Sequence, residues 1–173
     1  MDCSNLFIEG QKVSAVAKGM ARSLEDSRQR GVLDFEYRLD LYRFMTLLRQ
    51  AQGETRAVVF GSVTDSNEGL WRHAASAGFE VVTVERGFGR KEKRADISLV
   101  TRLCRDAYRF GHARRDRITL VTGNGDYEPV VKRLVADAFA VTVLYWAHAS
   151  RELRKAATAF HSLDPYISDL ALV

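Results

Sequence analysis

Short apolar runs alternate with longer amphipathic segments along this chain, and this alternation is the feature that most restricts its fold. The apolar runs that read as strands are 6–8, 55–63, 79–84, 117–122 and 140–146. Segments with helical spacing of apolar residues are 40–50, 67–77, 97–110, 126–138 and 150–160. Strands that alternate with helices favour a mostly parallel sheet covered on both faces. We therefore predict an α/β fold with about five strands.

Length and composition predict one globular domain over residues 1–173. Hydrophobic residues make up 46% of the 173 and charged residues 28%, which is typical of a folded chain with a sizeable core. The segment 20–34 is polar and charged, and is the best candidate for a mobile loop or an insertion. Cys3 and Cys104 form no CxxC pair, which favours a reducing cytoplasm over a disulfide framework or a zinc ribbon.

Charge and hydropathy restrict the partners. The formal net charge of +4 supports nucleic-acid binding weakly, and an ordinary protein with a positive surface fits it equally well. No apolar run approaches the roughly 20 residues of a membrane span, and the first residues lack the pattern of a signal peptide. We expect no membrane partner, and leave open a homodimer.

Acidic or amide residues sit close to the ends of the predicted strands. Glu9 follows the run 6–8, Asn124 and Asp126 follow the run 117–122, and Asp96 precedes a predicted helix. In an open α/β sheet, ligands bind beyond the carboxyl ends of the strands. Carboxylates gathered there repel one another unless a divalent cation sits between them. The pattern indicates a metal-dependent phosphoryl site.

Each of these residues also has an ordinary structural role. Asp126 and Asp96 could cap the helices that follow them, and for Asp126 the cap outweighs the metal ligand on residue pattern alone. Glu9 could be an exposed loop residue. GxGxxG, Walker A and GxSxG patterns are absent, which argues against nucleotide cofactors and serine hydrolysis.

A basic run precedes Asp96 and could draw in a nucleic-acid backbone, although a solvated loop face is its default interpretation. The candidates for backbone contacts are Arg90, Lys91, Lys93 and Arg94, with Arg114, Arg115 and Arg151 less strongly indicated. Three aromatic residues could stack on bases, although packing is their more common role. They are Trp71, Tyr127 and Trp146.

These motifs together resemble the NYN domain family, a branch of the PIN-like nucleases. The family pattern begins with a strand that ends in aspartate, glycine and asparagine, to which we match residues 7–12 (FIEGQK). Residues 91–99 (KEKRADISL) resemble the middle motif and residues 122–130 (TGNGDYEPV) the third. Weaker matches at 78–81 and 149–153 extend the resemblance from Leu6 to about Asp164. It implies a three-layer α/β/α sandwich.

The resemblance also implies Mg²⁺- or Mn²⁺-dependent hydrolysis of RNA by a metal-activated water. Carried over by position, Glu9, Asp96 and Asp126 would be metal ligands, and Asn124 would be a weaker ligand or would orient water. Single-stranded RNA is the expected partner.

The chain departs from the family pattern at four positions. Glu9 replaces an aspartate, Lys12 an asparagine, Asn124 an aspartate, and Arg102 a further helix acid. Fewer negative charges hold Mg²⁺ less well, and Lys12 or Arg102 could take the place of the cation and contact the nucleic acid. The sequence thus predicts a cytoplasmic endoribonuclease with a partly degenerate acidic site. The alternatives are a PIN-like domain that binds RNA or a regulatory partner without cleavage, and a domain that binds a small phosphorylated ligand.

Overall fold

The computed structural model describes residues 1, 3–52, 55–62, 67–84 and 91–172, without the side chains of 3, 4, 52 and 91–94. The helices in chain order are α1 (Cys3–Ala17), α2 (Leu24–Arg30), α3 (Leu41–Gln52), α4 (Glu68–Ser76), α5 (Lys91–Phe110), α6 (Glu128–Ala136) and α7 (Arg151–Ala156). The strands are β1 (Val58–Ser62), β2 (Glu80–Val84), β3 (Arg117–Leu120), β4 (Ala140–Tyr145) and β5 (Ala159–Ser162). Two 3₁₀ turns, η1 (Gly125–Tyr127) and η2 (Asp164–Tyr166), complete the described elements.

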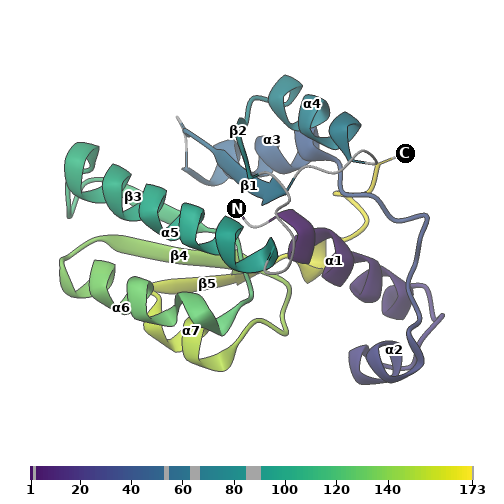
Figure 1. Cartoon of the computed structure of the whole chain (residues 1–173). Coiled ribbons are helices and arrows are strands. Elements are labelled where there is room, and N and C mark those ends of the chain that lie inside the picture. The colour runs from purple at the N-terminus through teal and green to yellow at the C-terminus, as the bar shows by residue number, and fades with distance from the viewer. Residues whose placement is uncertain (2, 53–54, 63–66, 85–90, 173) are drawn as a thin grey trace.

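The strands are parallel, as predicted, but they form two sheets instead of one. β1 pairs with β2, and β4 lies between β3 and β5 (Figure 1). On the other edge of β1, the amino group of Met1 donates to the carbonyl of Val58 (3.0 Å) and the Phe60 N–H donates to the carbonyl of Met1 (2.9 Å). Among the described residues, no ladder joins β1 to β3. The prediction of a single sheet of about five strands is therefore wrong.

The first predicted strand, 6–8, is also wrong, because these residues lie in α1. Leu6, Gly10, Val13 and Ser14 are buried with helical spacing, while Ile8 is exposed. An apolar run of three residues fits either a strand or one turn of helix, and here the next two turns decide the structure.

The last predicted helix, 150–160, is correct over α7 and wrong at its end. The chain leaves the helix after Ala156 and forms β5 on the open edge of β4. Thr158 fixes this change, because its N–H donates to the Val141 carbonyl (2.8 Å) and its hydroxyl accepts from the Val141 N–H (3.1 Å).

The segment 20–34, expected as a mobile loop or insertion, contains the capped helix α2. The Ser23 side chain accepts from the Asp26 N–H at its start, and Gly31 ends it with a φ of 66°. Asp34 is buried and binds the Ser14 hydroxyl of α1 (2.6 Å) and the ammonium of Lys18, the residue directly after α1 (2.8 Å). The segment is thereby tied to α1.

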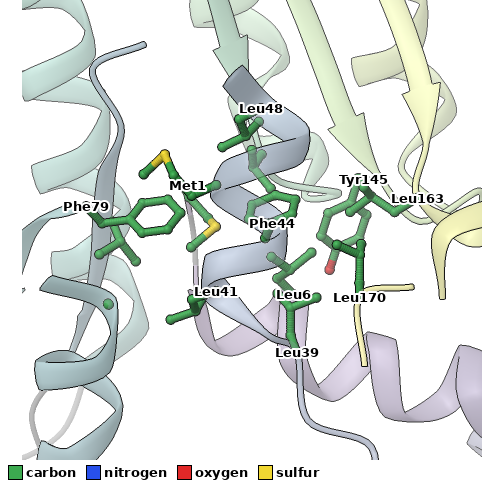
Figure 2. Packing of buried hydrophobic residues seen from close by; sticks show 14 of the residues in the cluster. Met1, Leu6, Leu39, Leu41, Phe44, Leu48, Phe79, Tyr145, Leu163 and Leu170 are labelled. Atoms are coloured by element: carbon green, nitrogen blue, oxygen red, sulfur yellow. The ribbon is translucent and has the colours of Figure 1, made fainter. Parts of the chain in front are cut away.

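Two apolar clusters hold the layers together. The larger cluster, part of which is drawn in Figure 2, joins α1, α3 and α4 to the C-terminal segment, with Leu6, Phe44 and Leu163 among its fully buried members. The second cluster lies under α5 and α6, where Leu99 and Leu134 pack with Val141 and Val143 of β4. No helix in the described ranges is long and apolar enough to cross a membrane.

Trp146, directly after β4, attaches α1 to the second sheet. Its side chain is fully buried, and its indole N–H donates to the Leu6 carbonyl at 3.0 Å. Gly10 makes the close approach possible, because a Cβ there would lie 2.8 Å from the indole and 2.9 Å from the Tyr37 ring.

We predict that Trp146→Phe lowers the free energy of unfolding by about 2 kcal/mol, because it removes the buried hydrogen bond to the Leu6 carbonyl and leaves a cavity where the larger indole was packed. Urea unfolding measures the change. Trp71→Phe is the matched control, since the Trp71 indole donates to the Asn67 side chain in a partly buried position (3.1 Å) and its loss should cost less. An equal loss in both variants would contradict a special role for the Leu6 bond.

Candidate active site

Asp96 and Asp126 line one cavity, although they come from different elements of the chain. The cavity has a volume of about 330 Å³, and its lining residues are Asp96, Ile97, Val100, Thr101, Asp126 and Tyr127. Asp96 comes from α5, and Asp126 from η1, the turn after β3. Two of the three residues predicted as metal ligands are therefore brought together.

Asp96 lies inside α5 rather than before it. The helix begins at Lys91, so Asp96 is in its second turn and does not cap it. One carboxylate oxygen accepts a hydrogen bond from the Tyr127 hydroxyl at 2.6 Å, and Tyr127 is 1% exposed. The phenol is a neutral donor, so it orients the Asp96 carboxylate and adds no positive charge to balance it.

Asn124, and not Asp126, caps the turn after β3. The Asn124 side-chain oxygen accepts from the Asp126 N–H at 3.0 Å, which leaves the exposed Asp126 carboxylate out of the capping role. Gly123 is needed beside this turn because a Cβ there would lie 2.2 Å from the Tyr145 ring. The Gly123 carbonyl also accepts from the Ser150 N–H (2.9 Å), which braces the turn against the start of α7.

Glu9 has basic side chains as partners from α1, from α2 and from the loop after β4. Its carboxylate lies 2.5 Å from the Lys12 ammonium, 3.2 Å from the Arg28 guanidinium and 2.6 Å from His148 Nε2. Burial by itself would raise the pKa of Glu9, but His148 and Lys12 outweigh it and lower the pKa to about 2. Glu9 is therefore a carboxylate whose charge is balanced within the protein.

The described residues contain no group of three or more His, Cys, Asp or Glu side chains placed to hold a metal ion. Glu9 therefore does not join Asp96 and Asp126 in one cluster. The two remaining carboxylates still suit Mg²⁺, which keeps several waters and binds proteins through one or two carboxylates together with substrate phosphates.

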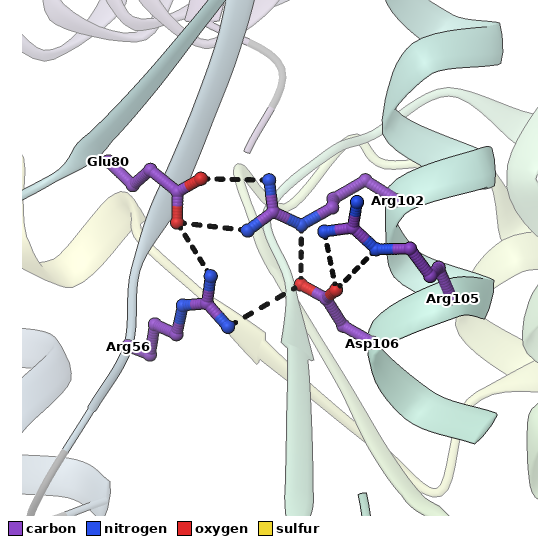
Figure 3. Close-up of polar contacts among 5 residues, drawn as sticks. All are labelled: Arg56, Glu80, Arg102, Arg105 and Asp106. Carbon is purple, nitrogen blue, oxygen red and sulfur yellow. Dashed lines mark hydrogen bonds and ion pairs between the residues drawn. The ribbon is translucent and has the colours of Figure 1, made fainter. Parts of the chain in front are cut away.

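Arg102, predicted to contact nucleic acid, is held by two carboxylates. Its guanidinium binds Glu80 (2.8 Å) and Asp106 (2.6 Å), and Arg56 and Arg105 complete this network (Figure 3). Hydrogen bonds from Arg102 and Arg56 lower the pKa of Glu80. Arg102 thus links α5 to β2, and Lys12 is similarly engaged by Glu9.

The basic run before Asp96 is only partly described. Arg90 lies outside the described residues, and Lys91, Lys93 and Arg94 lie in the first turns of α5 with side chains outside the description. Their contact with nucleic acid stays a prediction. The three aromatic residues considered for stacking, Trp71, Tyr127 and Trp146, are all buried, which favours packing.

A model of the NYN domain family matches residues 4–164, nearly the whole chain. This chain belongs to the NYN domain family. The fold is similar to the crystal structure of a protein of unknown function from Vibrio parahaemolyticus, with a TM-score of 0.64 and 21% identity over 80% of this chain and 85% of that chain. At that identity the likeness concerns the fold alone. No curated protein sequence matches the chain significantly.

The structure suggests a second register for the first motif, which begins at Asp2, two residues before the start of the family match at residue 4. The strand-like pairing beside β1 is made by Met1, and Asp2 and Asn5 follow it in the sequence with the same spacing as Glu9 and Lys12, which lie seven residues later. In this register an aspartate and an asparagine occupy the positions where the family pattern has them. Asp2 lies outside the described residues and Asn5 is exposed at the start of α1. The aspartate-x-x-asparagine spacing of Asp2 and Asn5 is the sequence feature from which this second register could have been recognised.

We predict that Glu9→Gln destabilises the protein by about 1–2 kcal/mol at pH 7, because it removes a carboxylate with a lowered pKa from its cations. A group with a lowered pKa contributes stability above its unfolded pKa, and loses it as the pH falls through its folded pKa. The difference between wild type and variant should therefore shrink from about pH 4.5 towards pH 2, as measured by urea unfolding at several pH values. Glu36→Gln is the control, since the Glu36 side chain is 93% exposed. A difference that did not change with pH would contradict the assignment.

Proposed function

We propose that this NYN domain hydrolyses phosphodiester bonds of single-stranded RNA with the help of Mg²⁺ or Mn²⁺. The observation that carries the proposal is the shared cavity of Asp96 and Asp126. These two carboxylates would hold the cation, with Asp2 as the third candidate ligand from its place in the sequence. When bound, such a cation neutralises charge on the phosphate and lowers the pKa of a bound water.

The residues of the chain have distinct parts in this proposal. Tyr127 holds one oxygen of Asp96, and the cavity is walled by apolar carbon from Ile97 and Val100. Asn124 shapes the turn that presents Asp126, and its amide lies 3.5 Å from the Asp126 carboxylate, from where it can orient a water. Arg90, Lys91, Lys93 and Arg94 would contact the RNA backbone. Glu9 stands in this proposal as a stabilising residue and not as a ligand.

A second candidate function is RNA binding without cleavage. It is favoured by one observation, that no three candidate ligands come together among the described residues. It requires RNA affinity that falls with salt and persists after chelation of metal. Hydrolysis, in contrast, requires divalent cation and an intact pair of carboxylates.

We expect Asp126→Asn and Asp96→Asn each to lower cleavage of a 5′-labelled single-stranded RNA in Mn²⁺ by about a hundredfold or more, because each removes a charge that holds the cation. EDTA should abolish cleavage by the wild type. Asp169→Asn, at an exposed acid outside the cavity, is the control and should cleave normally. Cleavage that survives both substitutions would refute the site, and salt-dependent binding with no cleavage at millimolar Mn²⁺ would support the second function.

Replacement of Lys91 and Lys93 together by Ala should weaken RNA binding and reduce the slope of log K against log salt by about 1.4, which corresponds to two phosphate contacts on a single strand. Fluorescence anisotropy at several salt concentrations measures this slope. Arg22 and Arg30, exposed around α2, serve as the matched double Ala control. Equal slopes for wild type and the Lys91/Lys93 variant would remove this part of α5 from the interface.

A further inference from the structure

Helix α7 carries three basic side chains on one face. Arg151, Arg154 and Lys155 have the i, i+3 and i+4 spacing that places residues next to one another on a helix, and all three are exposed. Among the described residues, only these three line a surface hollow of about 460 Å³. The fully buried Leu153 anchors the helix from another side, in the second apolar cluster. We call the three basic residues the α7 basic face.

The positive charge of the α7 basic face is not balanced by acidic neighbours. In the described part of the chain, no carboxylate forms an ion pair with any of its three side chains. Glu152, the acidic residue of α7, accepts a hydrogen bond from the Ser150 hydroxyl at 3.1 Å and does not line the hollow. Clustered cations repel one another, and an anion between them removes this repulsion. The hollow is therefore suited to an anionic ligand.

Arg154 is held in position by the protein itself. Its guanidinium donates to the Ala147 carbonyl at 3.1 Å and lies 4.3 Å from the centre of the Phe160 ring. The Ala147 N–H donates in turn to the Asp164 carboxylate at 2.8 Å, which fixes the loop that Arg154 binds. A guanidinium has five N–H donors, so donors remain for a ligand. Because the side chain is already ordered, less conformational entropy is lost when an anion binds.

The α7 basic face begins beside the turn that carries Asp126. The Ser150 N–H donates to the Gly123 carbonyl at 2.9 Å, and a Cβ on Gly125 would lie 3.0 Å from the Ser150 hydroxyl oxygen. α7 packs against η1 and lies beside α6 (Figure 1). On the other side of the cavity, Asp96 follows the basic run at the start of α5. Each of the two carboxylates of the cavity therefore has a basic segment next to it.

We propose that the α7 basic face binds phosphates of the RNA strand where it extends from the cavity of Asp96 and Asp126. This inference rests on the proposed function, which places the cleaved linkage at that cavity. The six residues of α7 span about 9 Å at 1.5 Å per residue, and this length matches two or three phosphates of a stacked strand at about 3.4 Å each. Arginine is suited to them because its N–H donors bind phosphate oxygens in pairs.

The same geometry indicates contact with the RNA backbone rather than with the bases. Arg154 covers the Phe160 ring, and the lining of the hollow contains no aromatic side chain on which a base could stack. Contacts to phosphates fix the position of a strand without reading its sequence. The α7 basic face would therefore hold strands of any sequence.

The first test measures binding of a single-stranded RNA of about 12 nucleotides by fluorescence anisotropy in EDTA, where metal-dependent cleavage is absent. Arg151→Gln combined with Lys155→Gln removes two charges and leaves the packed Arg154 in place. We expect about tenfold weaker binding near 0.1 M salt, and a slope of log K against log salt that is smaller by about 1.4. Unchanged affinity and slope, or no RNA binding by the wild type, would overturn the proposal.

The matched control is Lys132→Gln combined with Arg133→Gln on the neighbouring helix α6. It removes the same charge, but these two cations already pair with Glu128 and Asp137, so RNA binding should change much less. Equal losses in the two double variants would show an effect of net charge alone and would overturn the proposal.

A double-mutant cycle then locates the contact on the RNA. One phosphate at a time is replaced by an uncharged methylphosphonate. At the linkages that lie over α7, this replacement should weaken binding to the wild type several-fold and should scarcely change the affinity of the variant with Arg151→Gln and Lys155→Gln. Losses that add independently at every linkage would contradict a direct contact.

Competition distinguishes the strand from other anions. Neither AMP nor polyglutamate should displace the RNA when its concentration of negative charge equals that of the RNA. Displacement by AMP would assign the hollow to a small phosphate and displacement by polyglutamate to an acidic protein, and either result would overturn the proposal.

Cleavage in Mn²⁺ is measured separately, so the two proposals can fail independently. If the wild type cleaves RNA and the α7 variant binds it normally, only the role of α7 is refuted. If the α7 variant loses affinity and the wild type does not cleave, only hydrolysis is refuted.

Discussion

One buried hydrogen bond, from the Trp146 indole to the Leu6 carbonyl, fixes the position of α1. It joins the first helix to the end of β4, so residues at opposite ends of the chain share one apolar cluster. His148 follows two residues later and lies against Glu9. The attachment of α1 therefore decides the environment of Glu9, which faces the loop after β4 and the cations of α1 and α2.

The contrast between Glu9 and Asp96 explains why we assign them different roles. Each carboxylate accepts a short hydrogen bond, Glu9 from the Lys12 ammonium (2.5 Å) and Asp96 from the Tyr127 hydroxyl (2.6 Å). The donors at Glu9 include Lys12 and Arg28, whose charges compensate it. The donor at Asp96 is a phenol, which orients the group without removing its charge. An incoming cation would have to displace protein cations at Glu9, whereas the side chains that the structure describes place no cation against Asp96 or Asp126.

The sequence predicted the elements whose pattern extends over several turns or a complete strand. α3, α4 and α5 and the strands β1 to β4 were found, because their apolar periodicity identifies the buried face. The three residues 6–8 and the four of β5 were misassigned, because so short a run carries no period. The position of Asp126 after β3 follows the rule that ligand-binding residues lie beyond the carboxyl ends of strands, whereas Asp96 reaches the same cavity from the second turn of α5. The sequence did not identify Asn124 as the cap. Asn124 and Asp126 both carry a side-chain oxygen that can accept a backbone hydrogen bond, and only the geometry of the turn distinguishes them.

The interrupted sheet explains the ion-pair network around Arg102. Because no ladder joins β1 to β3 in the described structure, the unit of β1 and β2 must be held by other contacts. Two-stranded sheets are marginal by themselves, and apolar packing holds this one: Phe60 lies in one cluster with Leu99 of α5, and Val59 lies in the larger cluster. Arg102 adds a link from α5 to Glu80 on β2 (Figure 3). Partly exposed pairs of this kind contribute up to about 1 kcal/mol each, so the network orients β2 more than it stabilises it. Arg102 would have to leave Glu80 and Asp106 before its guanidinium could contact RNA.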